Sequence, residues 1–153
     1  MTDHAGVATE MDRDMARATG VVAASPAEVF DMLRHPANHA GISGDGSVRG
    51  ITDDDEPLVL GSRFGMRMRV GVPYRIHSTV VEFEEDRLIA WAHFAGHRWR
   101  WELEPTTDGS TRISETFDMT TAKFPPALRL MGYPKRHRDN VATSVANLIA
   151  HFA

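Results

Sequence analysis

Residues 88–103 read LIAWAHFAGHRWRWEL, and this stretch decides the fold. Two runs of alternating character flank residues 94–96, and such alternation is typical of paired β-strands. Gly96 suits the left-handed backbone position that closes a three-residue hairpin loop. The predicted loop sets three cross-strand pairs: His93 with His97, Trp91 with Trp99, and Ile89 with Trp101. All six side chains then share one face of the hairpin.

That shared face is the inner face of the predicted sheet. The alternate positions of the second strand are Arg98, Arg100 and Glu102, whose charges favour solvent. A row of tryptophans therefore points inward, with two histidines at one end. The row either fills the core, since cross-strand aromatic pairs stabilise sheets by themselves, or forms the wall of a pocket.

The following strand, residues 111–120, brings a carboxylate to the same inner face. The DG dipeptide at 108–109 is a hairpin signal. The expected register pairs Trp101 with Glu115, with closure of the turn one pair earlier or later as the alternatives. The apolar residues on this face are Ile113, Phe117 and Met119. A buried carboxylate is costly unless it is paired or protonated. Glu115 is therefore predicted to be a polar anchor, a general acid or base, or half of a structural ion pair.

Toward the N-terminus, residues 63–70 form another half-buried strand. The residues expected to face inward are Phe64, Met66, Met68 and Val70. Arg67 and Arg69 face solvent on the opposite side. Residues 74–84 form a further strand with two competing apolar sets, and a β-bulge would reconcile them.

Helices flank this run of strands. After a first strand at residues 16–24, Ser25 and Glu28 form a capping box around Pro26. That helix is followed by a second short one at residues 36–42. The C-terminal helix carries one apolar stripe: Val141, Val145, Leu148, Ile149 and Phe152. The predicted class is α+β, a helix-grip fold in which a curved antiparallel sheet of six to seven strands wraps around a long C-terminal helix.

The bulk properties narrow the function. The chain has 153 residues, a formal net charge of −4 and no cysteine. A net negative charge provides no overall positive potential that would attract nucleic acid. No stretch is apolar enough to span a membrane. Residues 1–14 lack the pattern of a secretory signal and are expected to form a flexible arm before a single domain, residues 15–153. A cytoplasmic monomer or homodimer is expected.

The chain resembles the START-like helix-grip superfamily (SRPBCC), in its polyketide cyclase/dehydrase and lipid-transport branch. The resemblance rests on ASPAEVF at 24–30, GSRF at 61–64, WELEP at 101–105, GSTR at 109–112 and the terminal helix. The resemblance implies a deep cavity between the sheet and the helix. It leaves several functions open, since the superfamily includes carriers, aromatase/cyclases, hydrolases and co-chaperone modules. These motifs specify the fold, so no catalytic residue is transferred. The main alternative at this chain length is a cone-shaped NTF2-like fold. That fold usually has its long helices before the sheet, whereas the longest predicted helix of this chain comes last.

The predicted binding residues combine the inner-face positions of the strands with the apolar stripe of the terminal helix. They are Phe64, Met66, Met68, Trp91, His93, His97, Trp99, Trp101, Glu115, Phe117, Met119, Val145 and Ile149. The candidates for acid–base chemistry are Glu115, His93 and His97. Two histidines are too few for a closed metal site, so neither a metal nor a cofactor is predicted.

Three functions are compatible with this pattern. The first is a carrier or sensor that holds a small hydrophobic molecule such as a lipid, polyketide, quinone or steroid-like compound. The second is a polyketide aromatase/cyclase or dehydratase, which needs converging polar groups in the cavity. The third is a protein-interaction module, which needs a filled core and an exposed apolar patch. The proline-rich residues 124–133 are expected to form a mobile lid over the pocket.

Overall fold

The computed structural model describes residues 4–93, 95–132 and 135–153. These residues form eight strands in one antiparallel sheet, in the order β1-β2-β8-β7-β6-β5-β4-β3. The strands are β1 Ala8–Met11, β2 Met15–Val22, β3 Val48–Ile51, β4 Arg63–Val70, β5 Val72–Glu84, β6 Leu88–Ala92, β7 Arg98–Pro105 and β8 Thr111–Asp118.

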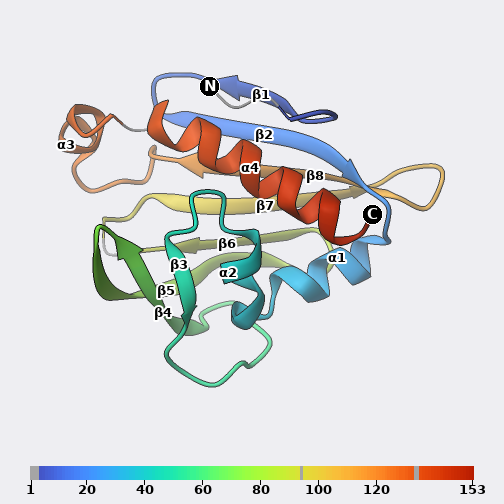
Figure 1. Ribbon diagram of the computed structural model, residues 1–153, viewed down its shortest axis with the longest axis horizontal. Coiled ribbons are helices and arrows are strands. Elements are labelled where there is room, and N and C mark those ends of the chain that lie inside the picture. The colour runs from blue at the N-terminus through green and yellow to red at the C-terminus, as the bar shows by residue number, and fades with distance from the viewer. Residues whose placement is uncertain (1–3, 94, 133–134) are drawn as a thin grey trace.

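Helix α4, Lys135–His151, lies along the inner face of the sheet (Figure 1). It packs mainly on β2 and β8. Val141, Val145 and Leu148 of its apolar stripe are completely buried. Because the stripe and the inner face of the sheet remove each other from water, this contact forms the core. The predicted α+β helix-grip class is confirmed.

The two short helices expected after the first strand are also confirmed, whereas a third, α3, lies in the segment expected to be a loop. Helix α1 (Pro26–Leu33), the 3-10 helix η1 (Pro36–Asn38) and α2 (His39–Ile42) follow β2, while α3 (Pro125–Leu130) precedes α4. The capping box is complete: the Glu28 amide donates to Ser25 Oγ at 3.3 Å, and the Ser25 amide donates to Glu28 Oε2 at 3.2 Å. Within the described ranges, no helix is both long and apolar enough to cross a bilayer.

The predicted hairpin registers are confirmed as well. The ladders pair Ile89 with Trp101, Trp91 with Trp99, Trp101 with Glu115, and Trp99 with Phe117. Gly96 has φ +84°, and its amide donates to the His93 carbonyl oxygen at 3.1 Å. Phe94, in the same loop, lies outside the described residues. Gly96 therefore closes the loop as a residue without Cβ can.

A β-bulge settles the facing of β5. The β5–β6 register shifts between Val80 and Glu82, which leaves Val81 as the extra residue. The shift brings Val80 and Phe83 to the same side. In β4 the predicted alternation holds as far as Met68, and Val70, at the hairpin end, is 47% exposed. The inward prediction for Val70 was wrong, because the β4–β5 hairpin extends beyond the core.

The sequence pattern missed two strands. Strand β1 lies inside the segment expected to be a flexible arm, where it pairs with β2. Strand β3 lies in the glycine-rich stretch after α2 and pairs with β4. Both are four-residue strands at the two edges of the sheet. Such short strands give too few alternations for a period of two to be visible.

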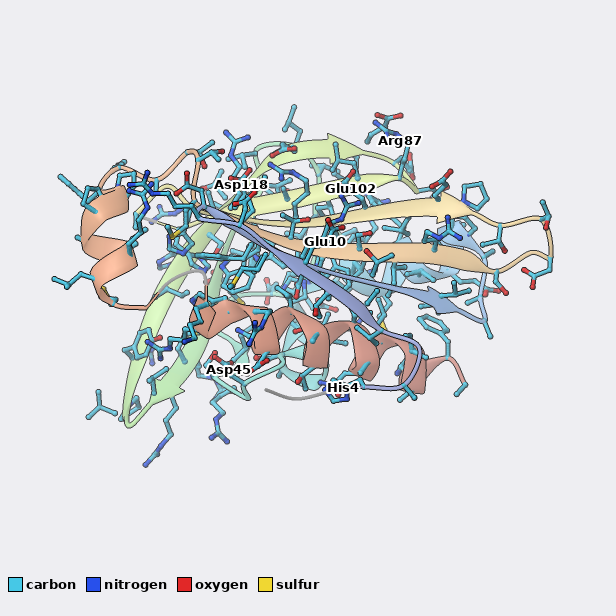
Figure 2. The ribbon with its side chains drawn as sticks, turned by 90° about the horizontal axis from the view of Figure 1, so that it is seen from above. His4, Glu10, Asp45, Arg87, Glu102 and Asp118 are labelled. Atoms are coloured by element: carbon cyan, nitrogen blue, oxygen red, sulfur yellow. The ribbon has the colours of Figure 1, made fainter. Side chains whose placement is uncertain are left out.

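The outer face of β8 is largely buried. Ser114, Thr116 and Asp118 alternate with the inward residues and so lie on the opposite face of the strand, yet each is only 5% exposed. Strand β8 is central, so side chains from its neighbours cover it: Arg17 donates to Ser114 Oγ at 3.2 Å, and Arg100 donates to Asp118 Oδ2 at 3.1 Å. Figure 2 shows Asp118 on the strands, away from α4. Lateral ion pairing therefore replaces hydration on this face.

Candidate functional site

A cavity of about 90 Å³ lies between the inner face of the sheet, the α2 region and α4. Roughly 10–15 Å³ of such space holds one water, so there is room for on the order of six to nine waters or one compact molecule with one or two rings. The wall consists of His39, Ile42, Ser43, Ser47, Val48, Met66, Met68, Trp91, His93, Trp99, Trp101, Glu115, Asn140 and Ser144. The sheet side of the cavity is thus mainly apolar, with Glu115 and His93 as its polar groups, and α4 adds Asn140 and Ser144.

About half of the predicted binding residues line this cavity. They are Met66, Met68, Trp91, His93, Trp99, Trp101 and Glu115. The other predicted residues pack behind the wall: Phe64, His97, Phe117, Met119, Val145 and Ile149. The alternation along a strand identifies all side chains on the inner face of the sheet. Because α4 packs on part of that face, only the remaining side chains line the cavity.

Sequence reasoning missed the other half of the wall, which comes from α2, the loop after it, the start of β3, and α4. The missed residues are His39, Ile42, Ser43, Ser47, Val48, Asn140 and Ser144. One available signal was on α4, where Asn140 and Ser144 stand four residues apart and therefore share a helix face beside the apolar stripe. The residues around α2 and β3 have no periodic signal, since only the packing of that segment against α4 brings them to the cavity.

A close backbone approach holds the loop after α2 against α4. A Cβ atom added to Gly44 would lie 2.0 Å from the Asn140 carbonyl oxygen. Gly44 therefore has to be glycine for the loop to approach the helix this closely. Ser43 and Ser47, on either side, both line the cavity, so this contact positions one wall.

Glu115 brings an unusual polar group into this wall. It is 5% exposed, and its Oε1 has no hydrogen-bond partner in the described part of the chain. Burial raises the pKa of Glu115 to about 8, a hydrogen bond from Ser144 opposes the rise, and the negative charge of Asp45 adds to it. Figure 2 shows Asp45 beside α4. The carboxyl group is therefore mainly protonated at neutral pH.

His39 forms a second polar point in the wall. Its ring stacks on Trp91, with the centroids 4.6 Å apart and the planes 19° apart, and its Nε2 lies 2.9 Å from the Leu33 carbonyl oxygen. Burial lowers the pKa of His39 to about 4, while the Leu33 hydrogen bond and Asp55 oppose the fall. The ring is neutral at pH 7, and α2 holds it in a fixed orientation.

The predicted histidine pair occupies one end of the tryptophan row. The His93 and His97 rings have centroids 5.5 Å apart, and His93 Nδ1 lies 2.5 Å from Ser78 Oγ. Burial, together with repulsion from His97, lowers the pKa of His93 to about 4. Burial lowers the pKa of His97 as well. Of the two, only His93 is part of the cavity wall.

The expected lid does not contribute to the cavity wall. Leu128 of α3 is buried, but Phe124, Leu130 and Met131 are 69%, 91% and 58% exposed. The wall residues come from other segments, and Tyr133 lies outside the described residues. Helix α3 projects from one end of the molecule (Figure 1), so the described part of this segment does not cover the cavity.

Comparison with known proteins identifies the family. Residues 15–153 match the family described as polyketide cyclase / dehydrase and lipid transport. The chain belongs to this family. The resemblance seen in the sequence motifs is thereby confirmed. The description of this family covers both enzymes (cyclases and dehydrases) and lipid-transport proteins. The cavity residues therefore have to indicate whether this member is an enzyme or a carrier.

Relatives and solved structures are similar over most of the chain. Protein Rv0088 of Mycobacterium tuberculosis is 36% identical over 140 residues, which cover 86% of this chain and 61% of that protein. The chain thus spans less than two thirds of this relative's length. A solution structure from Arthrobacter aurescens has a TM-score of 0.69 at 15% identity, covering 94% of this chain and 91% of that one.

A crystal structure from Rhodobacter sphaeroides is similar to the same extent. Its TM-score is 0.67 at 15% identity, and the match covers 95% of this chain and 96% of that one. At such identities the structural likeness establishes the fold alone. Across the described residues, no group of three or more His, Asp or Glu side chains is arranged to hold a metal ion.

Proposed function

We propose that this chain binds a small, mainly apolar molecule in the cavity and serves as a carrier or sensor. One observation supports this most directly: a wall of tryptophan and methionine side chains contains a buried carboxyl oxygen, Glu115 Oε1, that has no partner among the described residues. Apolar walls with a few placed polar groups are typical of ligand sites. The partner is a small molecule, and the polar end of that molecule lies at Glu115.

The cavity volume sets the size of the first ligands to test. About 90 Å³ suits a compact, single-ring or fused two-ring compound. A steroid-like or long-chain ligand would need the loop carrying Ser43 and Ser47 to move away from α4. Compact neutral aromatics are therefore the appropriate probes for the structure as it stands.

The test is a titration with 2-naphthol, following tryptophan emission and, independently, heat by calorimetry. Trp91 and Trp99 line the cavity, so binding is expected to change their emission. Val48→Phe places a ring in the wall position of Val48 and is expected to abolish the response. Val59→Phe is the matched control, since Val59 is 50% exposed and outside the wall. Absence of heat and of an emission change in the unaltered protein would reject the proposal.

The enzymatic alternative is favoured by a specific arrangement of titratable groups. A mainly protonated Glu115 and two neutral histidines, His39 and His93, line one cavity. In a dehydratase acting on a β-hydroxy ketone, a neutral histidine would take the proton α to the carbonyl. Glu115 would protonate the departing hydroxyl, which leaves as water. Glu115→Gln would then abolish turnover while substrate still binds.

The protein-interaction module is the third reading. It requires a filled core, and the cavity argues against it. The exposed apolar residues of α3 and of the β4–β5 hairpin would be its contact surface. Loss of a protein partner on Leu130→Ser, with naphthol binding absent, is the result that would favour this alternative over the carrier.

A further inference from the structure

Two buried polar atoms in the cavity wall lack partners. Within the described residues, neither Glu115 Oε1 nor His39 Nδ1 has a hydrogen-bond partner. Both residues are at most 5% exposed, and both line the cavity. Buried polar atoms are almost always hydrogen-bonded in folded proteins. Two unpartnered atoms on side chains of one cavity wall therefore indicate where the polar groups of a ligand would bind, once these side chains turn them toward it.

Hydrogen-bond geometry fixes the role of His39. The Leu33 carbonyl oxygen can only accept a hydrogen bond, so His39 Nε2, 2.9 Å away, carries the proton and donates. In the neutral ring the other nitrogen, Nδ1, then has a free lone pair. The cavity thus presents an acceptor at His39, and this acceptor calls for a hydroxyl or N–H group on the ligand.

The surroundings of Glu115 fix the opposite role. The groups that face it are Ser144 on α4, Asp45 in the loop after α2, Trp101 on β7 and Ala18 on β2. The cavity wall contains no lysine or arginine in the described part of the chain. A buried carboxyl group without a cation retains its proton, because burial disfavours the charged form. Its hydroxyl then donates, and it calls for a carbonyl or ether oxygen on the ligand.

We infer that the ligand is an uncharged, compact aromatic or cyclic molecule that carries a hydrogen-bond donor for His39 and a carbonyl-type acceptor for Glu115. This inference rests on the proposed binding function and names its ligand class. Carboxylates are excluded, since they would meet the Asp45 charge and a carboxyl group without any cation in the wall. A hydroxyaryl ketone is the simplest molecule with the required groups.

A panel of single-ring probes tests the inference by calorimetry at neutral pH. 3- and 4-Hydroxyacetophenone carry both groups, acetophenone carries only the acceptor, and phenol carries only the donor. The better hydroxyacetophenone isomer is expected to bind about tenfold more tightly than either single-group probe, as one additional buried hydrogen bond would give. 4-Hydroxybenzoate is expected to show no binding. Equal affinity of all neutral probes would overturn the ligand class.

Two variants separate hydrogen bonding from packing. Glu115→Met removes the donor and is expected to weaken acetophenone about tenfold, whereas Glu115→Gln supplies an amide N–H and keeps the affinity. His39→Phe keeps a ring against Trp91 but removes the acceptor, so hydroxyacetophenone weakens and acetophenone does not. For each variant the affinity is expressed relative to that of phenol for Glu115 variants, or of acetophenone for His39→Phe, so a general loss of stability does not mimic the effect.

The pH dependence and one cationic probe complete the test. Acetophenone does not titrate, so its affinity for the unaltered protein is expected to fall above about pH 8 as Glu115 ionises, and to stay constant in Glu115→Gln. Tyramine binding more tightly than hydroxyacetophenone, with proton release, would overturn the inference in favour of an amine ligand. If 2-naphthol binds but the panel shows no preference, only the inference fails; if nothing binds, the proposed function fails as well.

Discussion

Glu115 is buried in the cavity wall, and its pKa is raised. Strand β8 places it between Ala18 of β2 and Trp101 of β7, and neither neighbour carries a positive charge. Burial raises its pKa to about 8, from an ordinary value of 4.5. A carboxyl group whose pKa is raised on folding binds more protons in the folded state, so its contribution to stability falls as pH rises between these two values.

Replacing Glu115 by glutamine tests this balance. We expect Glu115→Gln to be more stable than the unaltered protein at pH 8, by about 1–3 kcal/mol, because the amide cannot ionise. At pH 4.5 the difference should be close to zero, since the carboxyl group is then protonated in the folded state. Urea unfolding at both pH values measures the difference. An equal gain at both would mean that the carboxyl proton is not its cause.

At the scale of elements, the cavity depends on how the loop after α2 meets α4. The loop contributes Ser43 and Ser47, and α4 contributes Asn140 and Ser144. Gly44 lies directly on the Asn140 carbonyl oxygen. Since a backbone oxygen cannot move aside as the end of a side chain can, this contact determines how closely the loop covers the cavity.

We therefore expect Gly44→Ala to open the cavity while the sheet stays intact. An added Cβ 2.0 Å from a backbone oxygen would force the loop outward. Hydrogen exchange of residues 43–48 should accelerate, and larger ligands should gain access. Gly41→Ala is the matched control, because a Cβ there meets nothing within 4 Å. Unchanged exchange in Gly44→Ala, or equal acceleration in both variants, would contradict this account.

At the scale of the whole molecule, four buried ionisable groups are mainly neutral near pH 7: His39, His93, His137 and Glu115. Burial lowers the pKa of His39 and His93 to about 4 and that of His137 to about 3, while it raises that of Glu115 to about 8. A histidine whose pKa falls on folding binds fewer protons in the folded state. Its contribution to stability is therefore lost as pH falls from 6.5 toward the folded value.

These opposite slopes predict a stability maximum near pH 6.5. Below it the three histidines together outweigh Glu115, and above it Glu115 alone titrates. Chemical unfolding at intervals from pH 4 to pH 9 would measure the profile. In Glu115→Gln the alkaline side should flatten while the acid side remains. A profile without loss between pH 6.5 and pH 4 would show that the histidines are not held neutral by the fold.

The strand registers were predictable because they depend on local features. Gly96 and the DG turn at 108–109 fix the loop lengths, and the period of two then assigns every side chain on three strands to a face. The position of Glu115 opposite Trp101 follows directly. Pattern alone could not distinguish core from cavity wall, so Phe64 and Phe117 were grouped with Trp91 and Trp99.

The sequence by itself determined the helix-grip class, the capping box of α1, the tryptophan row and the inward carboxylate of Glu115. Each of these rests on residues close in the chain, or on a period repeated over one strand or helix. Only the tertiary structure decided that His39 stacks on Trp91 and that Asn140 and Ser144 face the same cavity. The contact of Gly44 with α4 joins residues almost a hundred positions apart, and no local period encodes a contact over that separation.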